Sequence, residues 1–378
     1  MRIVFLGLSG VPFSKRAIDV RLEASIHLFM KLGYDVDILN RYGSVPEDLV
    51  SDGYHVINPF GGKQRNKLLK ILLYVIAYLY EPFRIIGMNW KKHIDVLFVN
   101  SGHFIDMVIY WIVSRLIGAK VVYQYCEYRA SFETGNPYHK CNGKLICKYG
   151  PTLWDGAICI TTFLEDDCKK KNPKVKTLKM YPICDYSNFV SAEKHEPGYK
   201  YIMFCGSVEY REVVNLIINS YNSSYIKNTC KLLMVLRGNK QIIEEVQREN
   251  PHTVIKSNLD YADLIAHYKG AFGLLIPLRN NIRDIARFPN KVCEYCASGN
   301  PIVTTGFGEM QYLFKDGTNA FVAEDFTVDQ YSKALDRLAA CENIDEIGVA
   351  SFKLGLNNFD INYYLDSMGT FIENVVEK

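Results

Sequence analysis

The sequence predicts an α/β protein built from two doubly wound domains in series. Three observations predict this class. Short apolar strands alternate with helical segments, the alternation stops once in a polar segment and then resumes, and several strands end in glycine or serine. Alternation of this kind with short connections implies parallel sheets covered by helices on both faces. The length of 378 residues also exceeds what a single hydrophobic core usually supports.

The first half of the chain supplies the first series. RIVFLGL is a buried strand, and RLEASIHLFMKLG is an amphipathic helix that ends at Gly33. Later segments repeat the two patterns: strands at 34–40, 94–102, 119–127 and 155–161, and helices at 68–80, 104–118 and 162–171. The polar segment 188–200 contains Pro197 and Gly198 and reads as a linker between domains.

A second series follows the linker. Its strands are expected at 201–206, 231–238, 253–258, 272–278 and 301–306. Its helices are expected at 213–221, 241–249, 261–268, 291–298 and 328–340, with a last helix in 362–378. Ligands of such sheets bind beyond the carboxyl ends of the strands. We therefore expect the main ligand in a central cleft between the two facing sheets.

Charge and cysteine content narrow the function classes. A net charge of +3 lacks the basic excess typical of nucleic-acid-binding proteins. The 11 cysteines lie within expected strands and helices, which suits a reducing cytoplasm. Cys293 and Cys296 form a CxxC pair, but no second pair has zinc-site spacing, so we expect no metal.

The segment Leu68 to Tyr80 is the most apolar one, with Lys67 and Lys70 before it and further cations between 84 and 92. No segment reaches the ~20 apolar residues of a spanning helix. Two interpretations remain open for 67–92: a buried core helix, or a helix lying on an anionic membrane surface.

Small and polar residues at strand ends mark candidate ligand positions. Gly10 follows the first strand, and Gly206 and Ser207 end the first strand of the second series, where glycine lets backbone N–H groups approach a ligand. Three polar residues, His103, Glu127 and Arg129, follow two strands of the first series. A structural turn remains an equally valid interpretation for each glycine-containing strand end.

The stretch ARFPNKVCEYCASG places Lys291 in the first turn of a helix and Glu294 three residues later, on one helix face. Arg283 and Arg287 precede it. Cations near free N–H groups at a helix start suit a diphosphate, and a carboxylate can accept two ribose hydroxyls. An ordinary Lys–Glu helix pair is the alternative.

The chain resembles the retaining glycosyltransferases of family 4, of the bacterial surface polysaccharide type, which have the GT-B fold of two Rossmann-like domains. The likeness covers nearly the whole chain and is clearest in FPNKVCEYCASGNPIVTTGFGEMQYLFKDGTNAFVAED. The matching residues there are Glu294, Ala297, Gly299, Pro301, Ile302, Val303, Gly308, Asp316, Gly317 and Asn319. Farther upstream, the family's Pro-x-x-Asp-x-x-x-Phe ending is matched by Pro182, Asp185 and Phe189.

The resemblance implies that the two domains bind different substrates. Residues 1–190, completed by a C-terminal helix at 360–378, would form the acceptor-binding domain, and 191–359 the nucleotide-sugar-binding domain. It implies a retained anomeric configuration, a nucleoside-diphosphate sugar as donor substrate, no cofactor and no required metal. A glutamate common eight positions before Glu294 is replaced by Ala286. Sugar recognition would then differ, with Asp284 as the candidate.

Two more family positions differ. The family usually has two basic residues after the first strand of the second domain. Here Ser207 stands at the first of these positions and Glu212 at the second, with Arg211 one residue before it. Lys291 and Arg283 would then supply the missing charge. A histidine common near Cys126 is absent, which leaves His103, Glu127 and Arg129 for the acceptor side.

The sequence therefore predicts a cytoplasmic glycosyltransferase, peripheral on the inner face of the plasma membrane, that builds a polysaccharide on a glycan or polyprenyl-linked acceptor. The expected diphosphate ligands are Gly206, Ser207, Arg211, Arg283 and Lys291, with Gly10 close to the donor, Asp284 on its sugar and Glu294 on its ribose. Two other readings stay open: another GT-B enzyme such as a sugar-nucleotide epimerase, or a non-catalytic GT-B partner protein.

Overall fold

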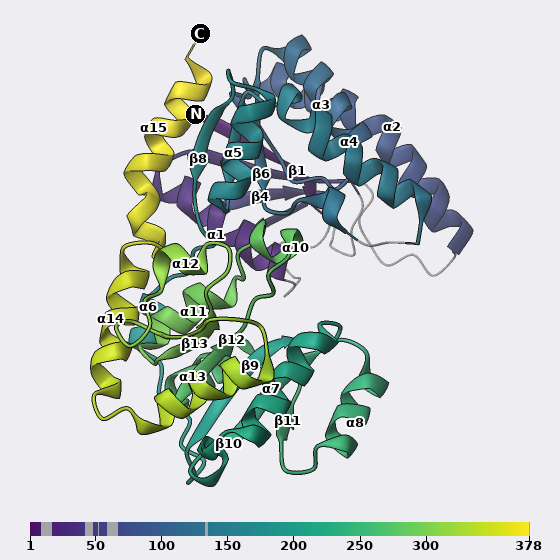
Figure 1. Ribbon diagram of the computed structural model, residues 1–378. Helices are drawn as coiled ribbons and strands as arrows, with labels where there is room; N and C mark the ends of the chain where they lie inside the picture. The colour runs from purple at the N-terminus through teal and green to yellow at the C-terminus, as the bar shows by residue number, and fades with distance from the viewer. Residues whose placement is uncertain (9–16, 42–47, 52, 59–66, 133–134, 378) are drawn as a thin grey trace. The chain divides into compact units, whose positions relative to one another are not determined.

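A computed structural model describes the chain except residues 9–16, 42–47, 52, 59–66, 133–134 and 378 (Figure 1). The chain divides into two compact units. The first comprises Met1–Tyr181 and Tyr364–Lys378, and the second comprises Pro182–Tyr363. The predicted class, two parallel-sheet domains of the GT-B type, is confirmed.

The first unit is built on an eight-stranded sheet in the order β3-β4-β2-β1-β5-β6-β7-β8. All neighbouring strands pair in parallel except β3 and β4. The strands are β1 (Arg2–Leu8), β2 (Asp35–Asn40), β3 (Asp48–Ser51), β4 (Tyr54–Ile57), β5 (Val96–Val99), β6 (Lys120–Tyr125), β7 (Gly156–Cys159) and β8 (Lys176–Lys179). The hairpin of β3 and β4 was not expected, because such short strands carry little apolar pattern.

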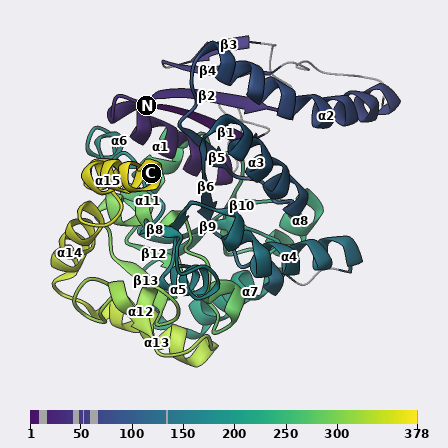
Figure 2. The same ribbon diagram turned by 90° about the horizontal axis from the view of Figure 1, so that it is seen from above.

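Helices cover both faces of this sheet (Figure 2). They are α1 (Ala17–Lys31), α2 (Lys67–Lys91), α3 (Phe104–Ile117), α4 (Pro137–Leu153), α5 (Thr162–Lys171) and α15 (Leu365–Val376), with a short 3-10 turn η1 (Arg129–Ser131). Helix α4 was not predicted, since Gly143, Gly150 and Pro151 weaken its helical pattern. The sequence does carry a signal for the start of α4, however, because Asn136 caps the helix and Pro137 is its first residue.

Helix α2 is longer than the sequence analysis expected. It continues through Pro82 to Lys91 instead of ending near Tyr80. Its part Ile71–Lys91 is long and apolar enough to cross a bilayer by length and composition, and it is the one such helix among the described residues. The expectation that no segment reaches that length was therefore wrong.

The second unit contains a six-stranded, fully parallel sheet in the order β11-β10-β9-β12-β13-β14. Its strands are β9 (Tyr201–Ser207), β10 (Lys231–Arg237), β11 (Val254–Lys256), β12 (Gly273–Ile276), β13 (Ile302–Thr305) and β14 (Phe321–Ala323). Its helices are α6 (Ser187–Val190), α7 (Arg211–Ser223), α8 (Lys240–Glu249), α9 (Tyr261–Gly270), α10 (Ile282–Ile285), α11 (Lys291–Ser298), α12 (Met310–Leu313), α13 (Val328–Ala340) and α14 (Ile344–Leu356), with 3-10 turns η2 (Tyr225–Asn228) and η3 (Ile361–Tyr364).

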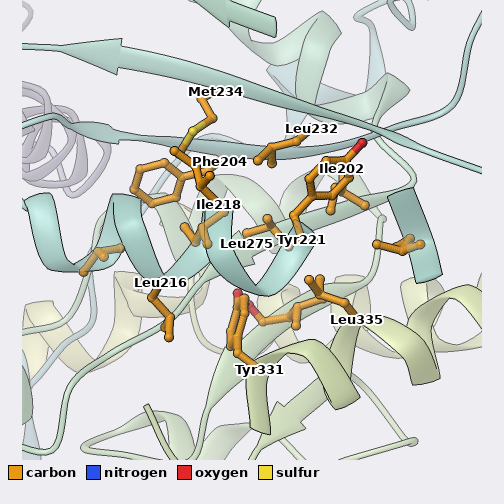
Figure 3. Close-up of a cluster of buried hydrophobic side chains, with 14 of the residues drawn as sticks. Ile202, Phe204, Leu216, Ile218, Tyr221, Leu232, Met234, Leu275, Tyr331 and Leu335 are labelled. Carbon is orange, nitrogen blue, oxygen red and sulfur yellow. The ribbon is translucent and has the colours of Figure 1, made fainter. Parts of the chain in front are cut away.

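One cluster of this unit's buried core lies where α7 and α13 pack on the sheet (Figure 3). Phe204 and Met234 from the sheet meet Ile218 from α7, and all three are buried. Tyr331 of α13 is buried as well, and its hydroxyl donates to the carbonyl oxygen of Val303 at 2.9 Å. The buried polar group is thereby satisfied, and α13 is fixed to β13.

The expected linker belongs to the second unit. Lys269 of α9 donates from its ammonium group to the carbonyl oxygens of Phe189 and Ala192. The backbone N–H of His195 donates to the carbonyl oxygen of Ala266 at 3.0 Å. Because these bonds tie 189–195 to α9, the structure divides the chain at Pro182 rather than at residue 191.

The same contact stacks two histidine rings. The rings of His195 and His267 lie 3.9 Å apart, and Lys256 Nζ lies 2.8 Å from His267 Nε2. Burial lowers the pKa of both imidazoles, and the charge on Lys256 lowers it further, against a raising effect of Asp263. Both rings are therefore stabilised in the neutral form.

We expect the second unit to lose stability on mild acidification. An unfolded histidine takes up a proton near pH 6.5, whereas the folded rings resist it, so stability is full above about pH 6.5 and declines as the pH falls from there through the lower folded-state pKa. His267→Gln should flatten this decline in thermal unfolding curves recorded between pH 7.5 and 5. The exposed His252→Gln is the matched control, and an equal flattening there would contradict the assignment.

Candidate functional site

The second unit has a cavity of about 540 Å³ at the carboxyl ends of β9 and β12. These two strands are the point where the strand order reverses, because β10 and β11 lie on one side of β9 and β12 lies on the other. Ligands of open parallel sheets bind at this kind of position. The residues that line the cavity are Ser207, Glu209, Tyr210, Arg211, Glu212, Arg279 and Arg283.

The sequence explains why β9 ends here. Gly206 and Ser207 close the strand, and the hydroxyl of Ser207 accepts a hydrogen bond from the backbone N–H of Glu209 at 3.2 Å. Helix α7 then begins at Arg211, and no side chain caps its first turn. The N–H groups of Val213 and Val214 donate to the carbonyl oxygen of Tyr210. Those of Arg211 and Glu212 are thus the donors that the helix start offers beside the cavity.

Three arginines and two glutamates line the cavity, so its lining has an excess of positive charge. Arg279 donates from Nη1 to Glu212 Oε2 at 2.8 Å, and Arg211 donates from Nη2 to Glu249 Oε2 at 3.1 Å. Buried Nη1 of Arg211 has no hydrogen-bond partner among the described residues. Arg283 lies over the ring of Tyr210, 5.6 Å from its centroid. Guanidinium groups grouped in this way match the oxygen atoms of a phosphate or diphosphate.

Asp284 does not face the cavity. It is 0% exposed, and it accepts from Nε of Arg279 at 2.9 Å and Nη2 at 3.1 Å. Nη2 of Arg287 lies 2.9 Å from Asp284 Oδ1. Both oxygens of Asp284 are thus engaged with two arginines, which suits this carboxylate to position them. Its expected contact with the donor sugar stays a prediction.

Ala286, in the place of the family's first glutamate, is buried as well. Neither position 284 nor position 286 presents a free carboxylate. The expectation that sugar recognition differs here from the family pattern stays a prediction.

Helix α11 places Lys291 and Glu294 as the sequence predicts. Lys291 Nζ donates to Glu294 Oε2 at 2.9 Å, and Glu294 is 5% exposed. Burial opposes the charge on Lys291, but the carboxylate of Glu294 outweighs it and raises the pKa of Lys291. Tyr295 on the same helix accepts from the backbone N–H of Cys205 at 3.0 Å, which ties α11 to β9. The pair is thus a fixed, charged group on the helix that follows the arginine-bearing loop.

Arg279 was not predicted as a site residue, although the sequence carries a signal for it. It directly follows the strand expected at 272–278, just as Ser207 directly follows the strand expected at 201–206. Its pairing with Asp284 and Glu212 could not be read from the sequence. Gly10, by contrast, lies outside the described residues, and its expected approach to the donor stays a prediction.

The acceptor-side candidates meet at the carboxyl ends of β5 and β6, two adjacent strands of the first unit. His103 Nδ1 lies 3.1 Å from the hydroxyl of Tyr138, and Arg129 Nη2 lies 3.6 Å from Glu127 Oε2. The Arg129 guanidinium rests on Gly102, where an added Cβ would lie 2.9 Å from Nη1. Glycine there lets the backbone before His103 approach Arg129, so the three candidates form one cluster.

Comparisons with known proteins agree with this geometry. Residues 199–341 match the family described as "Glycosyl transferases group 1". No curated protein matches the chain. Sucrose-phosphate synthase from Thermosynechococcus elongatus is similar over 99% of this chain and 98% of its own, at 13% identity and a TM-score of 0.77.

Two further solved structures share the architecture. HepE of Anabaena in complex with UDP-glucose has a TM-score of 0.68 at 12% identity, with 99% of this chain and 100% of that chain covered. The pneumococcal O-GlcNAc transferase GtfA in complex with UDP and GlcNAc has a TM-score of 0.67 at 10% identity, with 100% and 99% covered. The chain as a whole thus has the GT-B fold, and most of its second unit is similar to the group 1 glycosyl transferase family.

Proposed function

We propose that this protein is a retaining glycosyltransferase that moves a sugar from a nucleoside-diphosphate donor to a glycan or polyprenyl-linked acceptor during polysaccharide synthesis in the cytoplasm. The observation that carries the proposal is the arginine-lined cavity at the strand-order reversal, within the segment that matches group 1 glycosyltransferases. Solved neighbours that contain UDP or UDP-glucose make UDP sugars the first donors to test.

The residues take the following roles in this proposal. Arg211, Arg279 and Arg283, which line the cavity, hold the diphosphate together with the N–H groups at the start of α7. Lys291 of α11 adds a fourth cation to this set. These fixed cations offset the charge that develops on the departing diphosphate, so no metal ion is required. Glu294 accepts from the ribose hydroxyls. In the first unit His103, Glu127 and Arg129 bind the acceptor and orient its hydroxyl.

Lys291→Ala and Glu294→Ala are each expected to reduce sugar transfer about a hundredfold or more, because each removes a charged contact to the donor. Transfer is measured with a radiolabelled nucleotide sugar and membrane lipid extract as acceptor. Circular dichroism spectra check that both variants stay folded. Lys333→Ala, at an exposed helix pair with Asp329, is the matched control. Wild-type turnover in both α11 variants would refute the donor-site assignment.

The donor itself is found by thermal shift. A nucleotide sugar that binds the folded protein must raise the melting temperature. We expect a shift with one class of nucleotide sugar and a smaller one in Arg279→Ala. No shift with any donor would favour a non-catalytic partner protein. Conversion of the donor in the absence of an acceptor would favour an epimerase. NMR of the product linkage tests whether the anomeric configuration of the sugar is retained.

A further inference from the structure

Helix α2 carries an apolar stripe on its outer side. Leu72, Ile76, Leu79, Phe83 and Trp90 recur at helical spacing and are all exposed, Phe83 at 70% and Trp90 at 84%. At 3.6 residues per turn these positions fall on one face of the helix. A surface helix of a water-soluble unit normally turns polar residues outward. An exposed apolar stripe of this length indicates an interaction surface.

The opposite side of α2 packs against the rest of its unit. Ala77, Glu81, Ile85 and Met88 are buried. Glu81 Oε2 lies 2.6 Å from Nη2 of Arg41, at the end of β2. The helix is therefore anchored to its unit by one face, and the exposed stripe is a second, separate apolar face.

The neighbouring helices continue the surface. Helix α3 contacts both α2 and α4, so the three helices form one layer (Figures 1 and 2). On α3, Ile105, Ile112 and Leu116 are exposed at helical spacing. On α4, the lysines at 140, 144 and 148 are exposed and four residues apart, so they form one stripe. We call the exposed sides of α2, α3 and α4 the three-helix face.

Charge on this face is one-sided. The three helices contain eight lysines and arginines but two carboxylates, Glu81 and Asp106. Both carboxylates are buried and pair with Arg41, which lies 3.1 Å from Asp106. The network turns every negative charge of the three helices inward. The three-helix face therefore combines exposed apolar residues with cations. This combination is complementary to a bilayer with anionic headgroups.

We propose that the three-helix face docks on an anionic membrane surface, with α2 lying in the plane of the bilayer interface. The proposal does not rest on the proposed glycosyl transfer. Although α2 satisfies the length and composition for crossing a bilayer, spanning would expose its buried inner face to lipid and separate Glu81 from Arg41. An unpaired carboxylate in lipid is costly, so the in-plane position is favoured.

Flotation with vesicles tests the docking. The full chain is expected to float with vesicles of equal parts phosphatidylcholine and phosphatidylglycerol, and to float much less with phosphatidylcholine alone or at high salt. Leu79→Glu with Phe83→Glu should abolish flotation. Lys144→Glu with Lys148→Glu should weaken it about tenfold or more on anionic vesicles. Trp90 emission should shift to the blue on binding, and Trp90→Phe should remove that shift.

Matched controls lie in the second unit. Tyr312→Glu with Val349→Glu replaces equally exposed apolar residues, and Lys240→Glu with Lys353→Glu reverses equally exposed charges. Both should leave flotation unchanged. The proposal is overturned by wild-type flotation in the Leu79 and Phe83 variant, by equal flotation on neutral vesicles, or by resistance to alkaline carbonate extraction, which would indicate a spanning helix. If the wild type does not bind lipid but forms dimers, and the Leu79 and Phe83 variant is monomeric, the three-helix face would instead bind a second copy of the chain.

Discussion

Asp284→Asn is expected to destabilise the second unit by roughly 3 kcal/mol at neutral pH, because it leaves two arginines facing each other without their shared carboxylate. Asp284 is fully buried, and Arg279 and Arg287 both pair with it. Urea unfolding followed by far-UV circular dichroism measures the change. Asp316→Asn is the matched control, since Asp316 pairs with Arg337 at the surface, where an ion pair contributes little.

The pH dependence identifies the cause of this loss. Burial opposes the charge of Asp284, but the arginines outweigh it and hold the pKa of this carboxyl below its usual range. Its stabilisation is therefore present above the unfolded value of about 3.9 and is lost as the pH falls through the lower folded-state pKa. The wild type and Asp284→Asn should converge in that acidic range. A difference that persists unchanged there would contradict an electrostatic origin.

The variant also separates positioning from binding. If Asp284 orients Arg279 for the diphosphate, Asp284→Asn should weaken nucleotide binding although the variant still contains both arginines. We expect the thermal shift from UDP to shrink in Asp284→Asn and to remain in Asp316→Asn. An unchanged shift in Asp284→Asn would reduce Asp284 to a structural role.

Arg41→Met should destabilise the first unit by roughly 4 kcal/mol, because it leaves two buried carboxylates without a counter-charge. Arg41 Nη2 lies 2.6 Å from Glu81 Oε2 and 3.1 Å from Asp106 Oδ1, and it donates to the hydroxyl of Tyr110 at 2.9 Å. All three tryptophans of the chain, at 90, 111 and 154, belong to this unit, so their fluorescence reports its unfolding. Arg115→Met, at an exposed pair with Asp155, is the control and should change stability little.

Acid should partly rescue Arg41→Met. Burial raises the pKa of Glu81 even with Arg41 present, and loss of the arginine raises it further. Since the folded pKa then lies well above the unfolded one, the folded variant gains stability as the pH falls through that folded pKa and Glu81 takes up a proton. Glu81→Gln added to Arg41→Met should recover part of the loss at neutral pH. A deficit that grows on acidification would contradict this account.

Local patterns of the sequence determined much of the fold. Apolar periodicity predicted the central strands β1, β5, β6, β9, β10, β12 and β13, since buried parallel strands require continuous apolar runs. It did not predict β3, β4, β8, β14 or α4, because short strands and a helix that contains two glycines and a proline carry weak local signals. The linker is the clearest case of a local signal overruled. Its polar composition is that of a free segment, yet hydrogen bonds to α9 hold it in the second unit.

The sequence by itself determined where a ligand-binding edge should lie, because Ser207, Arg211 and Arg283 follow strand ends and strand ends of a parallel sheet meet at one edge. It also determined the Lys291–Glu294 pair, which helical spacing alone brings together. Only the tertiary structure decided that Asp284 holds Arg279 and Arg287, and that α2 buries one apolar face and exposes the other. The physical reason is that burial depends on which face of an element meets its neighbours. Arg279 reaches Glu212 across 67 residues of sequence, and no local pattern encodes such a contact.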